Sequence, residues 1–293
     1  MNFIYILAIL AVFFWSFNVI IGALLVDTLT PWQIAFFRWF IATVLILPFT
    51  IKGLIKNYHT IKRHKSLILW AAFWGISFSN TCVYYAAQTV QPVTLSLIGA
   101  TGPLFLIFWD WLIRHNKISH QQMVGLIITL IGVVVIVLFS RADKLGNISW
   151  RAGDLWMLGT AASFGFYSFL AAQKPHHLPQ FSFLSTCLIW GTIFTIPFFV
   201  YDCWVHPISH LTFETLGILL FLGIFNSFIA YLFWNWALEK SSTFKVGLTY
   251  YLMPVFSTLE AWFLLNEKIS SLQLIGATII LIGIFLSNYR KKI

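Results

Sequence analysis

The chain has 293 residues, of which 59% are hydrophobic and 9% are charged, and its mean hydropathy is +0.85. A water-soluble fold of this length would have too few polar side chains to cover its surface, so the composition excludes one and predicts a membrane protein. The formal net charge of +9 is scattered over short polar segments, which argues against a nucleic-acid partner.

Ten apolar stretches are long enough to cross the hydrocarbon core of a bilayer as helices, which takes about 20 residues each. We place them at residues 3–26, 31–51, 67–88, 92–113, 122–140, 153–173, 183–202, 214–234, 244–265 and 270–289. The first stretch follows no Lys or Arg and precedes no small-residue cleavage site, so we interpret it as a retained helix. Only loops 52–66 and 141–152 have the length for even a small fold, so we expect no appended soluble domain.

The second half of the chain repeats the first at a constant offset of 151 residues: Ala86, Pro103, Gly125 and Gly132, for example, recur as Ala237, Pro254, Gly276 and Gly283. Five spans fall within one repeat, and because five is odd, equivalent helices must cross the bilayer in opposite directions. We therefore predict an all-α membrane protein of ten transmembrane helices. Its two inverted five-helix repeats, residues 1–145 and 146–293, form one membrane domain. Such pairs are typical of secondary transporters, which bind their substrate between the repeats and open to each compartment in turn.

Positive charge is distributed unevenly between alternate loops. Thirteen Lys and Arg residues fall in the loops on one side, whereas the other side has Arg141, Lys144, Arg151 and Lys268. Cytoplasmic loops of membrane proteins have an excess of Lys and Arg, so we place both termini in the cytoplasm and the protein in a cytoplasmic (inner) membrane.

Three patterns in the sequence resemble those of a known family of carriers. Segment 14–19, Phe-Trp-Ser-Phe-Asn-Val, resembles its first-helix motif with Ser16 in place of the usual Gly, and Pro31, Arg38 and Ala42 resemble its second-helix pattern. Its repeat signature is similar to Ala237, Pro254, Glu267 and Gly276; the first half has Ala86, Pro103 and Gly125, but Asn116 where the family often has Glu. Over essentially its whole length the chain therefore resembles the ten-helix EamA-type carriers of the drug/metabolite transporter superfamily. The resemblance implies transport of an amino acid or related amphipathic compound, with export as the expected direction.

Two charged residues fall well inside predicted spans, where a charge at mid-bilayer costs about 2.5 to 3.5 kcal/mol on insertion scales. At 1.5 Å per residue, Arg38 lies about 10 Å and Glu260 about 7 Å from the outer ends of the second and ninth helices. As substrate-binding residues, Arg38 could hold a carboxylate, and Glu260 could take up an ammonium group or a proton as coupling ion. The alternatives are a structural ion pair between helices, or an arginine whose head group reaches the lipid interface.

Uncharged polar and aromatic residues complete the candidate site. Asn18, Asn80 and Asn226 fall well inside the first, third and eighth spans, where an unpaired amide is costly. Trp15, Tyr84 and Tyr250 could line a cavity for flat or amphipathic molecules. We include all six as substrate-binding candidates; hydrogen bonding between helices is the alternative for the asparagines. We expect the cavity walls to be the first, third, fourth, sixth, eighth and ninth helices, with the fifth and tenth packed outside.

Prolines and glycines recur at equivalent points of the repeats. Pro103 and Pro254 each remove a backbone donor near mid-membrane, so we expect them to bend the fourth and ninth helices, as hinges or as static shaping. Gly125 and Gly132, like Gly276 and Gly283, lie seven residues apart on one helix face. Close helix packing explains them, within the chain or in a homodimer.

Other function classes find little support in the sequence. The three cysteines lack metal or redox spacing, no His pair makes a convincing metal site, and no phosphate-binding glycine loop suggests a cofactor. An intramembrane enzyme would need a nucleophile elbow or a His-Glu-x-x-His motif, and neither is found. A channel would need a continuous polar stripe. The sequence thus predicts a secondary transporter of a small metabolite, with an enzyme or a channel as alternatives.

Overall fold

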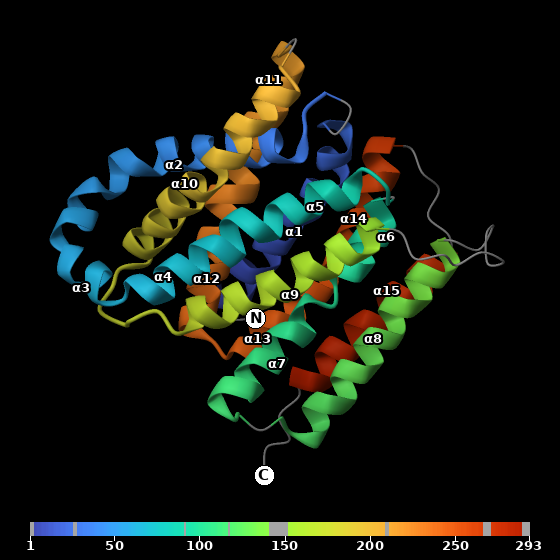
Figure 1. Cartoon of the computed structure of the whole chain (residues 1–293). Coiled ribbons are helices and arrows are strands. Elements are labelled where there is room, and N and C mark those ends of the chain that lie inside the picture. The colour runs from blue at the N-terminus through green and yellow to red at the C-terminus, as the bar shows by residue number, and fades with distance from the viewer. Residues whose placement is uncertain are drawn as a thin grey trace.

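The computed structural model describes residues 3–25, 28–90, 92–116, 118–140, 152–208, 211–265 and 271–288; the regular elements in this part of the chain are all helices, with no strand (Figure 1). The first half contains α1 (Phe3–Leu25), α2 (Pro31–Lys56), α3 (Tyr58–Arg63), α4 (Lys65–Ala71), the π-helical η1 (Ala72–Phe78), α5 (Ser79–Ala87), α6 (Pro92–Gly99), α7 (Gly102–Arg114) and α8 (His120–Ser140). The second half contains α9 (Ala152–Ala172), α10 (Gln180–Val205), α11 (Phe213–Phe221), the π-helical η3 (Leu222–Ile229), α12 (Ala230–Lys240), α13 (Thr243–Thr249), the 3₁₀-helical η4 (Tyr250–Leu252), α14 (Met253–Leu265) and α15 (Ser271–Asn288).

Five helical stretches of the described residues are long and apolar enough to cross a bilayer: Pro31–Lys56, Lys65–Ala87, Ala152–Ala172, Gln180–Val205 and Phe213–Lys240. Shorter apolar helices accompany them, and large apolar side chains such as Phe49 and Trp204 point outward. The expectation of an all-helical fold is therefore confirmed in these residues, and the long apolar helices support a multi-pass membrane protein. The count of ten spans and their inverted arrangement stay predictions.

The segment that we expected to be a loop at residues 52–66 is largely helical. Helix α2 continues to Lys56 and is followed by α3, which projects at one end of the molecule (Figure 1). The helix continues past the apolar stretch because Lys52 and Lys56 are good helix formers whose exposed side chains can reach water. The second long loop, 141–152, lies almost entirely outside the described residues.

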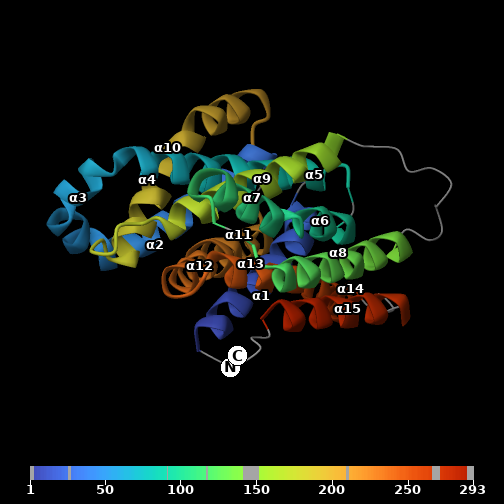
Figure 2. The ribbon, with the colours of Figure 1, turned by 90° about the horizontal axis from the view of Figure 1, so that it is seen from below.

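Helices α8 and α15 lie side by side and run in opposite directions, apart from α2, α3, α4 and α10 (Figures 1 and 2). A Cβ added to Gly132 would lie 2.8 Å from the carbonyl oxygen of Gly276, and one added to Gly283 would lie 2.7 Å from the carbonyl oxygen of Gly125. Backbones this close leave no space for a side chain, so the glycines found in the sequence serve packing within the chain at this point.

Other contacts between the two halves of the chain are also reciprocal: where a helix of the first half packs against one of the second, the equivalent helices pack in the same way. Helix α1 packs against α12 and α14, while α9, which begins the second half, packs against α5 and α7. Likewise α2 packs against η3, and α10 packs against η1. The first and second helices of each half thus contact the third helix of the other half, so the core lies between the halves.

Two kinds of irregularity interrupt the core helices at equivalent places. Pro103 and Pro254 each stand at the second residue of a helix, α7 and α14, after a break in the span. Such a break is the expected effect of proline, whose role as a hinge stays a prediction. The π-helical turns η1 and η3 also correspond under the 151-residue offset, and we did not expect them from the sequence.

The α8–α15 contact yields a stability prediction. We expect Gly132→Ala to lower the free energy of unfolding by about 1–3 kcal/mol, because the added methyl group must displace backbone. Thermal unfolding of the purified protein in detergent measures the change. Gly159→Ala is the matched control, since no atom lies within 4 Å of its added Cβ, and it should leave stability unchanged or slightly raised. Equal effects of the two substitutions would contradict the packing role.

Candidate functional site

A network of buried polar groups centres on Arg38, a residue of α2 that is fully buried at 0% exposure. Its Nη1 donates to Asn18 Oδ1 on α1 at 3.1 Å and to the Tyr84 hydroxyl on α5 at 3.0 Å. Its Nη2 donates to the carbonyl oxygen of Asn226 at 3.2 Å, and its Nε donates to the Ser227 hydroxyl, both on η3. One guanidinium therefore joins three helices of the first half to one of the second.

All these partners of Arg38 are neutral. In the described residues no carboxylate oxygen lies within 4.0 Å of the guanidinium, so the arginine is neither in an ion pair there nor at the molecular surface. A buried cation that only dipoles compensate keeps a positive potential around it. The site is electrostatically suited to an anionic group.

The carbonyl groups of the two π-helical turns are hydrogen-bond acceptors for side chains. Gly75 O on η1 accepts from the Tyr231 hydroxyl at 2.8 Å and from Asn80 Nδ2 at 2.9 Å. Its counterpart under the repeat offset, Asn226 O on η3, accepts from Trp15 Nε1 at 2.9 Å and from Arg38. A π-helical turn displaces carbonyls from the regular α-helical ladder, which explains why both are available.

Glu260 on α14 lies close to α1, the helix that also bears Asn18, and its carboxyl group is hydrogen-bonded to that helix. The hydroxyl of Ser16 donates to Glu260 Oε1 at 2.5 Å. The other carboxyl oxygen, Oε2, is buried without a hydrogen-bond partner among the described residues, and the same is true of the side-chain oxygen of Asn226. Two acceptors and one cation are thus placed around α1.

A small central cavity of about 30 Å³ lies between the halves. It is lined by Trp15, Asn18, Ser79, Asn80, Val83, Met157, Thr160, Phe164, Tyr231, Tyr250 and Met253. These residues belong to α1, α5, α9, α12, η4 and α14, which correspond to the expected first, third, sixth, eighth and ninth helices. The volume is that of about one water molecule, so a metabolite would need the halves to move apart.

Aromatic rings close one side of the central cavity. The ring centroid of Trp15 lies 5.0 Å from that of Phe164 and 5.2 Å from that of Trp234, and Phe164 lies 5.5 Å from Tyr250. Next to them, Pro103 and Leu106 of the fourth expected helix border a gap too narrow for water. We call Trp15, Phe164, Trp234 and Tyr250 the aromatic constriction.

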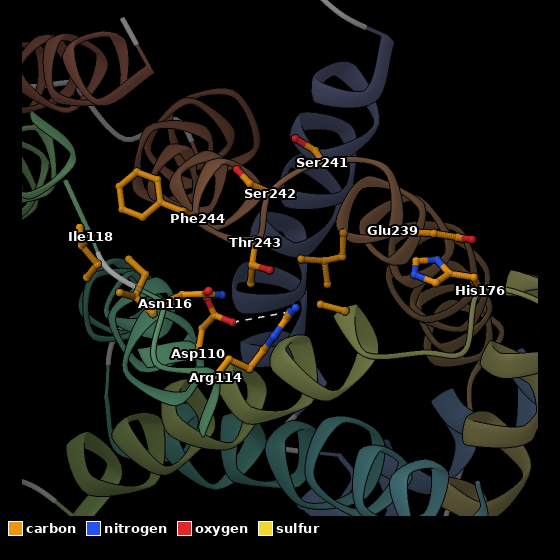
Figure 3. A pocket seen from close by; sticks show the side chains of 13 residues that line it. Asp110, Arg114, Asn116, Ile118, His176, Glu239, Ser241, Ser242, Thr243 and Phe244 are labelled. Atoms are coloured by element: carbon orange, nitrogen blue, oxygen red, sulfur yellow. Dashed lines mark hydrogen bonds and ion pairs between the residues drawn. The ribbon is translucent and has the colours of Figure 1, made fainter. Parts of the chain in front are cut away.

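Beyond the constriction lies an open hollow of about 410 Å³, which we call the vestibule (Figure 3). Asp110 and Arg114 of α7 face the segment 241–244, and His176 and Glu239 form a third wall. Arg114 lies 3.8 Å from Asp110, and Asn116 donates to the same carboxylate at 2.9 Å. The vestibule is polar and large enough for a small metabolite.

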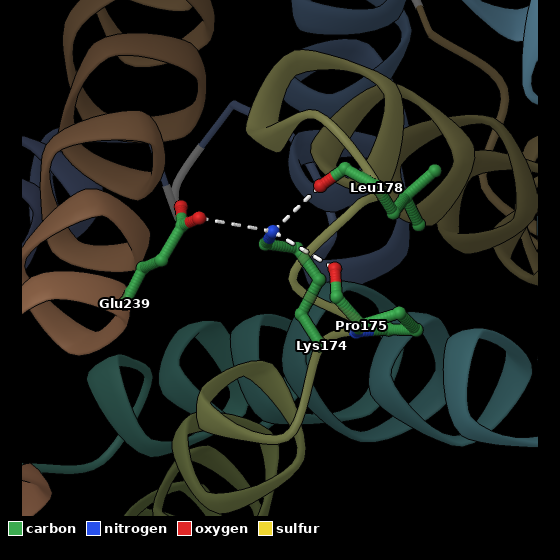
Figure 4. A network of polar contacts seen from close by, with 4 residues as sticks. All are labelled: Lys174, Pro175, Leu178 and Glu239. Atoms are coloured by element: carbon green, nitrogen blue, oxygen red, sulfur yellow. Dashed lines mark hydrogen bonds and ion pairs between the residues drawn. The ribbon is translucent and has the colours of Figure 1, made fainter.

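The vestibule wall is stabilised by the buried ammonium group of Lys174 (Figure 4). Lys174 Nζ donates to the carbonyl oxygens of Leu178 at 2.6 Å and Pro175 at 3.3 Å, and lies 3.3 Å from Glu239 Oε1. This lysine ties the α9–α10 connection to the end of α12.

Comparison with known proteins identifies the architecture. The sequence matches the EamA-like transporter family over residues 2–138 and again over residues 151–289. The chain belongs to the EamA-like transporter family. The resemblance drawn from the sequence motifs is thereby confirmed.

Relatives of this EamA-family chain are named as transporters. An uncharacterized transporter of Archaeoglobus fulgidus is 24% identical over 98% of both chains. A protein of Salmonella typhimurium named "probable amino-acid metabolite efflux pump" is 22% identical over 98% of this chain and 95% of its own. A crystal structure with 16% identity, covering 97% of this chain and 96% of the other, superposes with a TM-score of 0.73 and supports the fold.

The structure brings most of the candidate residues of this EamA-family chain together. Trp15, Asn18, Arg38, Tyr84 and Asn226 share one hydrogen-bond network, and Asn80 joins a second one. Trp15, Asn18, Asn80 and Tyr250 line the central cavity, whereas Arg38, Tyr84, Asn226 and Glu260 are not among its lining residues. Substrate binding by these residues stays a prediction.

Sequence reasoning missed Ser16, Ser227, Tyr231 and Phe164. The repeat offset itself could have pointed to Tyr231, because it is the counterpart of Asn80, and the two side chains are hydrogen-bonded at 2.9 Å. Nothing in the sequence distinguished Phe164 from the many other phenylalanines.

The Lys174 cluster gives a second stability prediction. We expect Lys174→Met to cost about 3–5 kcal/mol, because it leaves Glu239 and the carbonyl oxygen of Leu178 without this donor. Lys240→Met is the control, since that lysine is exposed, and it should have little effect on thermal unfolding. The double variant Lys174→Met with Glu239→Gln should recover part of the loss. No recovery would show that the ion pair is not the main interaction.

Proposed function

We propose that this EamA-family protein is a secondary transporter that moves a small amphipathic metabolite with an anionic group, an amino acid or a close relative, by alternating access. The observation that supports this most directly is the fully buried Arg38, which has neutral partners and no carboxylate within ion-pair distance in the described residues. Its partner Asn18 lines the central cavity, so only the Asn18 side chain would separate Arg38 from a substrate carboxylate in an enlarged cavity.

Two acceptors support a zwitterionic substrate over a simple anion. Asn226 Oδ1 and Glu260 Oε2 are buried without hydrogen-bond partners among the described residues. An ammonium group has three donors and is the natural partner of such oxygens. The name of the Salmonella typhimurium relative points to the same substrate class and to export.

Reciprocal contacts support the inverted repeat on which alternating access depends. Gly132 of α8 approaches Gly276 of α15, and Gly283 of α15 approaches Gly125 of α8. Because Gly132 is equivalent to Gly283 and Gly125 to Gly276, the same contact occurs twice with the two helices exchanged. Such exchange of roles is the mark of a two-fold relation, as at the interface of a symmetric dimer. Because α8 and α15 are antiparallel, the axis must be perpendicular to both, which for membrane-spanning helices means in the membrane plane.

Charge supports the proposed orientation. The vestibule face of the described chain bears Arg114, Lys174 and Lys240, so the positive-inside rule assigns the vestibule to the cytoplasm of a cytoplasmic-membrane protein. Substrate for export would then enter through the vestibule and meet the aromatic constriction.

Transport by purified protein in liposomes tests the role of Arg38. We expect saturable flux of one member of an amino-acid and metabolite panel, and a rise of about 10- to 100-fold in the half-saturating concentration for Arg38→Met, since a charge-assisted hydrogen bond is lost. Arg38→Lys should lose less. Flux that does not saturate would indicate a channel, and a covalently altered product would indicate an enzyme.

A pH gradient tests Glu260. If this carboxyl group takes up the coupling proton, an imposed gradient should stimulate flux of the wild-type protein, and Glu260→Gln should lose that stimulation, because an amide cannot change protonation state. Saturation by substrate should persist in the variant. Equal stimulation of both proteins would exclude Glu260 as the coupling site.

A further inference from the structure

The two π-helical turns are held by side chains from the opposite half of the chain. Tyr231, on α12 of the second half, donates its hydroxyl proton to Gly75 O on η1 of the first half. Trp15 and Arg38, both in the first half, donate to Asn226 O on η3 of the second half. Gly75 and Asn226 correspond under the 151-residue offset, so equivalent backbone acceptors are held by donors that do not correspond: the counterpart of Trp15 is Phe166, and that of Tyr231 is Asn80.

Under the proposed inverted repeat, the two contacts lie at different depths along the central cavity. Asn80 and Tyr231, also equivalent under the offset, are hydrogen-bonded to each other and line that cavity, which places them near the axis that relates the halves. Gly75 precedes Asn80 by five residues, toward the α4 end, where His64 meets His177 beside the vestibule residue His176. Asn226 precedes Tyr231 by five residues on the antiparallel segment, away from the vestibule residue Glu239. One contact thus lies about one helical turn toward the vestibule and the other about one turn away from it.

We propose that these two contacts are the paired gates of the transport cycle: the Tyr231–Gly75 contact holds the vestibule side closed, and the Trp15/Arg38–Asn226 contact, completed by Ser227, holds the opposite side closed. Ser227 and Tyr231 are positioning residues in this scheme, because they act through the π-helical turns and need not touch substrate. The inference rests on the proposed alternating access and assigns the residues that decide which side opens.

The two gates are chemically unequal. The one away from the vestibule includes a guanidinium that donates to four groups, whereas the vestibule gate consists of the neutral Tyr231 hydroxyl and its carbonyl acceptor. Charge-assisted hydrogen bonds are about twice as strong as neutral ones, so the gate opposite the vestibule is the harder to open without a substrate.

Side-specific labelling of a buried cysteine tests the scheme without any substrate. In a variant without Cys82, Cys187 and Cys203, Ser79→Cys places one thiol on the wall of the central cavity. A membrane-impermeant maleimide is applied to right-side-out and to inside-out vesicles, and the labelling rate is measured from each face.

We expect Tyr231→Phe to raise the labelling rate from the vestibule face about two- to tenfold and to leave the other face unchanged, as for the loss of one neutral hydrogen bond. Ser227→Ala should raise it from the opposite face. Arg38→Lys, which keeps the positive charge but has fewer donors for Asn226 O and Ser227, is the second variant for that gate.

Two matched controls separate gating from general loosening. Tyr167→Phe removes an equally buried hydroxyl group that bonds Asn235 within the second half, and Ser185→Ala removes a fully buried hydroxyl group that donates to Phe181 O within α10. Neither bond joins the two halves, so neither control should favour one face.

Equal changes on both faces, or changes no larger than those of the controls, would overturn the gate assignment. Because the readout needs no transported substrate, it is independent of the flux assay. Side-specific labelling without flux would contradict the proposed function and support the gates, whereas saturable flux without side-specific labelling would do the reverse.

Discussion

Inside a membrane-spanning bundle, a polar backbone group that leaves its helical ladder must find a partner within the protein, because lipid offers none. The carbonyl groups of Gly75 and Asn226 are placed in this position by the π-helical turns η1 and η3. Each accepts a hydrogen bond from the opposite half of the chain, and Gly75 O accepts a second one from Asn80 of its own half. Because these two carbonyl groups need donors, they form hydrogen bonds that hold the halves together at two points around the central cavity.

The two halves share a backbone plan but differ in the side chains that complete it. A Cβ on Gly75 would lie 2.1 Å from the Tyr167 ring, so this tyrosine requires a glycine there. At the equivalent place in the other half, Ser16 is smaller than Tyr167, and Asn226 has space for a side chain whose Nδ2 donates to Phe14 O at 2.5 Å. Arg38 has Ile189 as its counterpart. Among the described core residues, the buried guanidinium therefore occurs in the first half of the chain and has no equivalent in the second.

Much of the fold was predictable because membrane helices are selected by length and apolarity, and because the offset of 151 residues is visible in Pro103 and Pro254 and in the glycines of α8 and α15. Both prolines lie where the helices break, as their missing donors require. The π-helical turns were not predictable, since no residue type encodes them as proline encodes a break. The cluster around Arg38 was predictable in part, because burial of charges and amides at mid-membrane demands partners, but the partner of each depends on helix rotation.

A substrate could drive the proposed cycle by replacing the acceptors that the Arg38 guanidinium loses when the helices move apart. Moving η3 away from Arg38 would cost the bonds to Asn226 O and Ser227 and leave a buried cation short of acceptors, which is strongly unfavourable. A substrate carboxylate can supply those acceptors, so it would bind the opened arrangement better than the closed one, and a ligand shifts an equilibrium only through such a difference. Opening the vestibule side breaks one neutral hydrogen bond, from Tyr231 to Gly75 O, and Asn80 Nδ2 can still donate to that carbonyl, so no buried charge is left without acceptors. In the proposed cycle, therefore, the vestibule side can open while the protein is empty, and the opposite side opens when the site is loaded, which is the order that export requires.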